Sequence, residues 1–189
     1  MNKENEKNYD TKHLQDEIDQ EISEIEELLK NIPNFKPTGQ RRQIWPSLEE
    51  TLARAGWTAD RSVDVSEICS KLSSIGVSFH TFAKEFISSY NYLTFYFPKK
   101  NLNKYSVCKF DALWAADHYV EFRLEEDQSI IGHQLCPIGV ADHGMTVLLI
   151  DDIGRMFASI ERKLFFLANT VKDGFEKLNR NERFEPVDE

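Results

Sequence analysis

The fold of this chain is decided by a stretch that reads, from residue 132 to residue 157, GHQLCPIGVADHGMTVLLIDDIGRMF. It holds two apolar runs, Leu135–Val140 and Thr146–Ile150, which are too short for independent helices and suit buried strands. Short acids and a glycine follow in Asp151–Gly154, a composition typical of a tight turn. Because apolar residues alternate after that turn in Arg155–Ile160, the stretch predicts antiparallel strands joined as a β-hairpin.

The other strands are expected on either side of this hairpin. Leu93–Phe97 and Tyr105–Phe110 are rich in β-formers and are separated by a turn composition at Pro98–Asn101. Leu164–Ala168 is a further apolar run. Pro137 has no N–H to donate, so the first hairpin strand should pair on one side only at this residue or end there.

Three helices are predicted before the strands. Ser47 and Glu50 form a capping box at the start of the first helix, which Gly56 ends, with Trp57 folding back onto the core. Asp64 is expected to cap the second helix and Ser78 the third. The predicted buried faces are Val65, Ile68, Cys69, Leu72 and Ile75 in the second helix, and Phe79, Phe82, Ala83, Phe86, Ile87 and Tyr90 in the third.

The remaining segments complete an α+β pattern. Ala112–Phe122 has helical spacing and predicts a short helix, and Glu125–Asp127 reads as a polar loop. Thr170 is expected to cap a last helix, which Gly174 weakens from within. The order therefore predicts N-terminal helices packed on a mainly antiparallel β-sheet, with a closing C-terminal helix.

The first forty residues differ in composition from the rest. We interpret 1–40 as an acidic N-terminal helical extension and linker, and 41–189 as the α+β domain. An apolar stripe from Leu14 to Leu29 has helical spacing, and residues 1–30 carry ten acidic residues against four lysines. The stripe is expected either to pack on the body of the protein or to meet another chain, including by helix-mediated self-association.

Composition limits the partners of this chain. A net charge of −9 over 189 residues disfavours nucleic acid and anionic membranes, and favours a basic partner. No apolar run reaches the length of a transmembrane helix. Cys69, Cys108 and Cys136 are odd in number and far apart, which suits a reducing compartment. We therefore expect a cytoplasmic protein.

No pattern predicts a catalytic or metal site. His133, Cys136 and His143 are the best metal candidate, but a structural zinc site needs a fourth ligand. The cysteines lie on apolar faces or within a strand, without the base that a nucleophile needs. Asp151 and Asp152 are adjacent on a strand and point to opposite faces unless the turn folds them together. We predict no cofactor, no metal and no enzymatic activity.

Three motifs in order resemble the third subfamily of SUKH immunity proteins. The first motif is Leu52-Ala53-Arg54-Ala55-Gly56-Trp57, followed by Asp60-Arg61 and Val63-Asp64-Val65. The second is Ile75-Gly76, followed by Phe79-His80-x-x-Ala83-x-x-Phe86-Ile87. The third is Leu135-Cys136-Pro137-Ile138-Gly139, followed by a strand that ends in Asp and then by Gly154-Arg155-Met156-Phe157. The resemblance covers residues 48–178. In one place the chain departs from the family, because Tyr90-Asn91-Tyr92-Leu93 stands where the family usually has Phe-Gly-Gly-Leu.

This resemblance implies a bacterial immunity protein that binds and neutralises a cognate polymorphic toxin domain without catalysis. The acidic charge of the chain is consistent with a basic toxin domain, because opposite charges speed association. A second interpretation is an intracellular adaptor or regulatory scaffold protein of the same superfamily without a toxin partner. An enzyme such as a Cys/His hydrolase is the third.

Two groups of residues are singled out for these roles. The exposed acidic loops are predicted to bind the partner through Glu121, Glu125, Glu126, Asp127, Asp142, His143, Asp151 and Asp152. The motif residues with a structural role are predicted to be Gly56, Trp57, Pro137, Gly139, Gly154 and Arg155.

Overall fold

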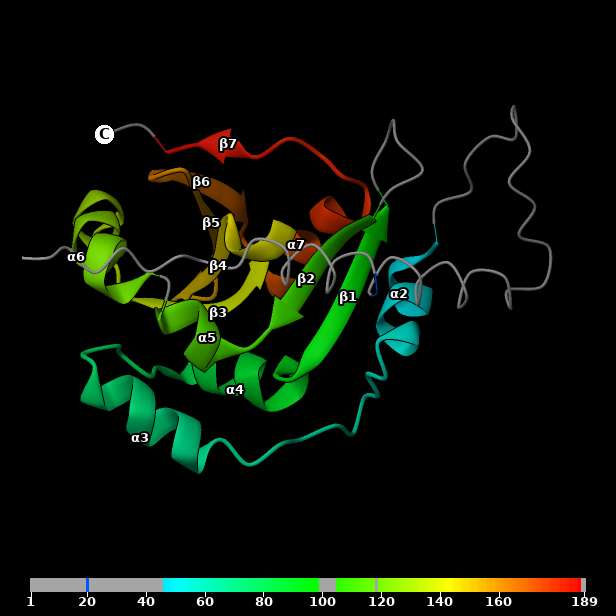
Figure 1. Ribbon diagram of the computed structural model, residues 1–189, viewed down its shortest axis with the longest axis horizontal. Coiled ribbons are helices and arrows are strands. Elements are labelled where there is room, and N and C mark those ends of the chain that lie inside the picture. Colours follow the sequence, from blue (N-terminus) through cyan, green and yellow to red (C-terminus); the bar gives the residue numbers. More distant parts are fainter. Residues whose placement is uncertain (1–19, 21–45, 99–104, 118, 188–189) are drawn as a thin grey trace, which may run out of the picture. The chain divides into compact units, whose positions relative to one another are not determined.

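The computed structural model describes residue 20 and residues 46–98, 105–117 and 119–187. The predicted acidic extension lies outside these residues apart from Gln20, and so does most of the turn expected at 98–101. The residues from 46 onward belong to one compact unit. Their elements form an α+β arrangement with a seven-stranded antiparallel sheet, which confirms the predicted fold class (Figure 1).

The helices and strands follow the predicted order, except for a helix over Val120–Ile131 and a last short strand, Glu185–Pro186, which were not predicted. The helices are α2 (Leu48–Arg54), α3 (Ser66–Ser74), α4 (Thr81–Tyr90), α5 (Ala112–Asp117), α6 (Val120–Ile131) and α7 (Val171–Asn179), with a short 3₁₀ turn η1 (Asp142–Gly144). The strands are β1 (Leu93–Pro98), β2 (Tyr105–Phe110), β3 (Leu135–Ala141), β4 (Thr146–Asp151), β5 (Met156–Ile160), β6 (Lys163–Ala168) and β7 (Glu185–Pro186).

The sheet is a meander in which each strand pairs with the next in antiparallel fashion. The predicted hairpin forms its centre, where β3, β4 and nearly all of β5 are buried on both faces. Pro137 pairs with Leu149 of β4 but with no residue of β2, as its missing N–H predicts. Gly139 lies so close to β2 that a Cβ atom would stand 2.7 Å from the Lys109 carbonyl oxygen. Only glycine fits there without a shift of the backbone.

Helix α7 packs against both β1 and β6, so the sheet curls around it (Figure 1). Its Phe175 is the centre of an aromatic cluster, with ring centroids 5.9 Å from Phe86, 5.6 Å from Phe95 and 5.5 Å from Phe110. All four rings are buried. The preceding Gly174 packs directly on the Met156 side chain of β5. The glycine that weakens the helix locally is therefore what lets α7 approach the sheet.

Helix α2 begins as the sequence predicts. The Glu50 N–H donates to Ser47 Oγ at 3.1 Å, and the Ser47 N–H donates to Glu50 Oε2 at 2.9 Å, which completes the capping box. Gly56 follows with a positive φ of 82°. Trp57 stacks on Tyr90 with ring centroids 5.8 Å apart, but it is only partly buried rather than a full core plug.

The predicted starts of the next two helices are wrong by one or two residues. Helix α3 begins after Val65, although Asp64 Oδ1 still accepts the Ser66 N–H at 2.9 Å. Helix α4 is capped by His80, whose Nδ1 accepts the Ala83 N–H at 3.2 Å, and not by Ser78. The imidazole nitrogen of His80 therefore caps the helix by accepting a backbone N–H, a role that a serine oxygen usually has.

Two residues of the predicted buried faces are exposed. Ile75 at the end of α3 keeps 44% of its surface in solvent, and Phe82 in the first turn of α4 keeps 40%. Both lie where a helix starts or ends, so helical spacing alone does not decide which neighbours cover them.

The polar loop predicted at Glu125–Asp127 is wrong, because these residues lie within α6. Tyr119 and Asp127 explain the error: Asp127 faces inward and accepts the Tyr119 hydroxyl at 2.6 Å. Arg123 Nη2 donates to the same carboxylate at 2.6 Å. A buried acid at an inward position interrupts the apolar spacing from which the helix could have been predicted. The single short helix expected over Ala112–Phe122 is likewise divided between α5 and α6.

Candidate partner-binding site

The structure distributes the eight predicted partner-binding residues over three places. Glu121, Glu125 and Glu126 are exposed on α6. Asp142 and His143 lie in η1, at the end of the hairpin where β3 passes into β4. Asp151 and Asp152 lie at the opposite end, where β4 turns into β5. The eighth residue, Asp127, is buried on the inward side of α6 and does not belong to the predicted surface.

Asp151 is also withdrawn from that surface, because it is completely buried and serves the turn. Its Oδ1 accepts the N–H groups of Arg155 at 2.7 Å and Ile153 at 3.2 Å. Its Oδ2 accepts the Arg155 Nε–H at 2.6 Å. Gly154 supplies the positive φ of 90° that this turn needs. Of the two acids expected at the surface, Asp151 therefore stabilises the turn from inside the protein.

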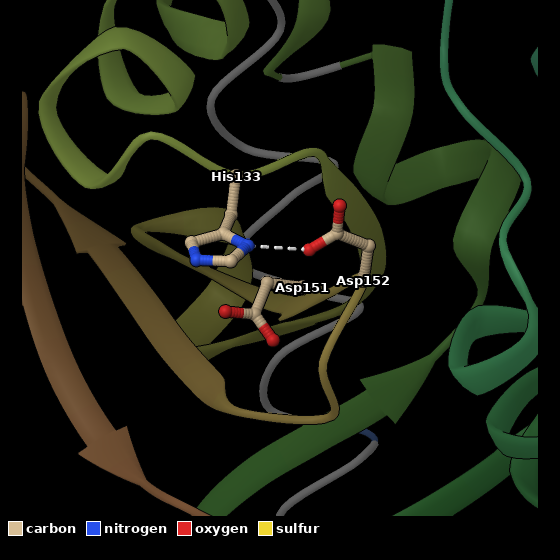
Figure 2. Close-up of side chains that lie close together, drawn as sticks. All are labelled: His133, Asp151 and Asp152. Atoms are coloured by element: carbon tan, nitrogen blue, oxygen red, sulfur yellow. Dashed lines mark hydrogen bonds and ion pairs between the residues drawn. The ribbon is translucent and has the colours of Figure 1, made fainter.

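Asp152 is half-buried and pairs with His133, as Figure 2 shows. The distance from His133 Nδ1 to Asp152 Oδ1 is 2.7 Å. Burial works to raise the pKa of Asp152, but the hydrogen bonds from His133 and the backbone outweigh it, and the pKa is lowered. The turn thus folds the two adjacent aspartates towards one histidine, which the strand alternation alone does not predict (Figure 2).

The possible metal ligands fall into a different group from the one considered in the sequence. Ligand atoms of His133, Asp151 and Asp152 lie within 4.8 Å of one another. Asp151 is already engaged with the Arg155 guanidinium, so the three do not form an open ligand set. Cys136 is buried in β3, and His143 lies at the other end of that strand. The His133, Cys136 and His143 set is therefore not assembled.

Helix α4 begins directly against this turn. The ring of Phe82 packs on Gly154, so that a Cβ atom there would stand 2.8 Å from its Cε1. Burial lowers the pKa of His80, while the Ile150 carbonyl and the carboxylates of Asp152 and Asp151 act in the opposite direction. Two sequence motifs seventy residues apart therefore meet at one end of the sheet, around the Asp151–Arg155 turn.

Two of the three cysteines are unsuited to nucleophilic chemistry. Cys108 and Cys136 are fully buried. Burial raises the pKa of both thiols, that of Cys136 to about 12. A thiol with such a pKa is not a thiolate near neutral pH.

Three of the predicted partner-binding acids are exposed together on α6. Glu121 and Glu125 are four residues apart and exposed, so they project from one side of the helix. Glu126 is exposed beside them and pairs with Arg123 Nη1 at 2.7 Å. We call these three residues the α6 acidic face.

The turn that departs from the family pattern keeps the backbone shape that glycine would allow. Tyr92 has a φ of 68° and an exposed side chain, and its N–H donates to the Phe110 carbonyl. Arg61 holds the turn by donating to the carbonyl oxygens of Ser89 and Asn91, each at 2.8 Å. The sequence contained Arg61 within a motif, but its contact with this turn is visible only in the fold.

A cavity that no sequence pattern predicted opens at the η1 end of the sheet, with a volume of ≈ 410 Å³. Its lining comes from the six strands β1 to β6, from η1 and from the chain around and after the end of α7. Asp142 is the one predicted partner-binding residue that lines it. The other lining residues, which include Glu182 and Arg183, are far apart in the sequence and come together only because the sheet curls.

The comparison with known families agrees with this architecture. The model of the SUKH-3 immunity protein family matches residues 44–181, which include the helices α2 to α7 and the strands β1 to β6. The chain belongs to the SUKH-3 immunity protein family. No curated protein and no solved structure matched the chain.

Proposed function

We propose that this protein is a non-catalytic immunity protein that binds a cognate toxin domain and neutralises it. The carrying observation is membership of the SUKH-3 immunity protein family over residues 44–181. Immunity of this kind needs a surface and not a reaction centre. The buried thiols and the internally bonded His133–Asp152 pair are consistent with that requirement.

The charge of the protein favours a basic toxin domain. The chain has a net charge of −9, and the α6 acidic face presents Glu121 and Glu125 to solvent. A negative surface attracts a positively charged partner over about 10 Å at 0.1 M salt, which speeds association more than it slows dissociation. Toxins that act on nucleic acid carry such basic surfaces for their own substrate.

Co-expression with candidate toxin domains, taken from large secreted proteins if any are encoded next to this gene, tests the proposal. We expect the protein to restore growth, to co-purify with the toxin domain, and to leave that domain chemically unchanged. A toxin domain that stays lethal and does not bind would contradict the immunity function and favour an adaptor role.

Kinetics then test the acidic face. Glu121→Gln combined with Glu125→Gln should slow association several-fold at low salt, with little change in dissociation. Glu85→Gln combined with Glu161→Gln is the matched control, since both residues are exposed on other elements. Equal effects of the two double variants would show that only net charge matters.

We also propose a cytoplasmic location. All three cysteines are free thiols in the structure, which suits a reducing compartment. Among the described residues, no helix has the length and apolar character to cross a membrane.

We propose that residues 1–40 form a separate acidic extension. Its apolar stripe from Leu14 to Leu29 mediates self-association. Sedimentation of the full chain and of a chain lacking 1–40 tests this. A concentration-dependent mass only in the full chain is expected, and identical monomers would contradict it.

A further inference from the structure

The first turn of α4 is capped differently from the first turns of α2 and α7. In α4 the Ala83 N–H donates to His80 Nδ1 at 3.2 Å. The corresponding acceptor in α2 is Ser47 Oγ, at 3.1 Å, and in α7 it is Thr170 Oγ1, at 3.2 Å. The three bonds have nearly the same length, but only the imidazole can gain a proton near neutral pH.

The direction of the α4 hydrogen bond fixes the state of the imidazole. A backbone N–H can only donate, so Nδ1 of His80 must present its lone pair to Ala83. The neutral ring therefore carries its proton on Nε2, whereas an imidazolium carries a proton on both nitrogens. Protonated His80 cannot accept the Ala83 N–H, and the cap exists only while His80 is neutral.

The end of the helix also opposes a positive charge on His80. The free N–H groups of the first turn make a helix N-terminus partially positive, so a cation there is unfavourable. The first turns of α2, α3 and α7 contain acids that would offset such a charge, namely Glu49, Glu50, Glu67 and Asp173. The first turn of α4 contains none. A proton on His80 is therefore not neutralised within its own turn.

The surroundings of His80 act in both directions. The titratable or charged groups on the elements around it are Asp151, Asp152, His133 and Arg155 at the β4–β5 turn, the buried Cys136 of β3, and Lys84 and Glu85 of α4. The carboxylates of Asp152 and Asp151 favour a protonated ring, but they already pair with His133 and Arg155 (Figure 2). Burial outweighs them and lowers the pKa of His80, so the ring is neutral at pH 7.5.

The side chain that this capped turn positions is Phe82. It lies in the first turn of α4, two residues after His80, and its ring packs on the buried Gly154 of the β4–β5 turn. Ile153, directly before that glycine, keeps 51% of its surface in solvent. Opening of the first turn of α4 would carry the Phe82 ring off Gly154 and expose more apolar surface beside Ile153.

We propose that His80 is an acid-sensitive switch: when it takes up a proton, the first turn of α4 opens and Phe82 leaves the β4–β5 turn. At neutral pH the imidazole accepts the Ala83 N–H and the ring of Phe82 covers Gly154. This switch does not depend on toxin binding. Its test therefore needs no toxin, and its failure would leave the immunity function standing.

Amide hydrogen exchange of the full chain, measured by NMR from pH 7.5 to pH 5.0, tests the proposal. The protection of Ala83, relative to an unfolded peptide at the same pH, should fall about five- to tenfold on acidification, the size of a lost helix cap. The amides of Glu50 and Asp173 are controls in the same spectra, because their acceptors are hydroxyl groups. Constant protection of Ala83, or an equal fall at all three amides, would overturn the proposal.

Variants at the two histidines assign the proton. His80→Asn keeps a side-chain oxygen for the Ala83 N–H but does not titrate, so the protection of Ala83 should no longer depend on pH. His80→Ser repeats this test with the acceptor that α2 uses. His133→Gln removes the other imidazole at the turn and should retain the fall. A fall that persists in both His80 variants, or that disappears in His133→Gln, would place the proton elsewhere and overturn the proposal.

The amide signal of Gly154 reports whether Phe82 leaves the turn. The aromatic ring shifts this signal while the two residues are in contact. On acidification the signal should move with the same midpoint as the loss of Ala83 protection, and it should stay in place in His80→Asn. A Gly154 signal that does not move, or that moves equally in His80→Asn, would show that His80 does not control Phe82 and would overturn the proposal.

Discussion

The two ends of the β3–β4 hairpin carry similar residues and use them differently. One end has Asp151 and Asp152 beside His133, and the other has Asp142 followed by His143. Asp151 is completely buried and accepts three hydrogen bonds from its own turn. Asp142 lines a cavity of ≈ 410 Å³ that is open to solvent. The Asp151 carboxylate is bonded within its own turn, whereas the Asp142 carboxylate accepts the Ser106 hydroxyl of a neighbouring strand and borders the cavity.

The backbones of the two ends differ in the same way. The β4–β5 turn has a positive φ at Gly154, whereas η1 has positive φ at Asp142 and His143 as well as at Gly144. Residues in this conformation cost about 1–3 kcal/mol each and gather at functional sites. Met145, directly after η1, is 69% exposed, while Gly154 is covered by Phe82. The β4–β5 turn, which we call the closed end, is therefore covered by its own bonds and by Phe82. The η1 end is more exposed to solvent.

Phe86→Ala should have the largest effect, because Phe86 belongs to the core that both ends share. It is buried against Phe110 and Phe175, so its truncation should lower the free energy of unfolding by about 3–5 kcal/mol. Phe82→Ala, on the exposed side of the same helix, should cost much less. Chemical denaturation measures both, and a loss below about 1 kcal/mol for Phe86→Ala would contradict the shared core.

Asp151→Ala should destabilise the β4–β5 turn. It leaves the Arg155 guanidinium and two turn N–H groups without their acceptor, and we expect a loss of roughly 3 kcal/mol. The neighbouring Asp152→Ala removes a half-exposed pair and should cost less than about 1 kcal/mol. Equal losses of unfolding free energy in denaturant titrations would show that the buried Asp151 stabilises the turn no more than the half-exposed Asp152 does.

Gly154→Ala should cost about 1–2 kcal/mol for the positive φ alone, and more because its methyl group meets the Phe82 ring. Gly132→Ala is the matched control, since Gly132 also has a positive φ but has open space around its Cβ position. The difference between their melting temperatures measures the contact between α4 and the turn. If the two variants melt alike, the helix does not hold the turn.

His80 should make the closed end sensitive to acid. Burial lowers its pKa in the folded protein, so below the ordinary value of about 6.5 the unfolded chain binds more protons. Stability should therefore fall as the pH drops from 7.5 to 5.5. His80→Asn retains a helix cap without a titrating group, and its unfolding free energy should depend less on pH over this range. Parallel pH profiles of the two proteins would contradict the assignment.

Removal of metal should have no effect at either end. Zinc needs about four ligands, and Asp151, one of the three candidates, is occupied by Arg155. We expect no stoichiometric zinc by elemental analysis and an unchanged melting temperature in EDTA. One zinc per chain, with a lower melting temperature after chelation, would show that the His133 cluster binds metal.

The central hairpin could be predicted from sequence because its signals are local. Two apolar runs, a proline and a turn of Asp and Gly are each enough to place a strand or an end, and β3, β4 and β5 lie where they indicate. The capping box at Ser47 and the cap at Thr170 were predicted for the same reason. Helix α6 was missed because the partners that make Asp127 an inward residue are recognised only once Arg123 and Tyr119 are folded against it.

By itself, the sequence determined the order of the elements, the antiparallel pairing at Pro137 and the family to which the chain belongs. Tertiary structure alone decided which acids are buried and which are exposed. A carboxylate becomes buried or open according to residues far along the chain: α4 closes over the Asp151 turn, while β1, β6 and the end of α7 converge beside Asp142. Burial and hydrogen bonding depend on those distant neighbours, and spacing within one segment does not contain them.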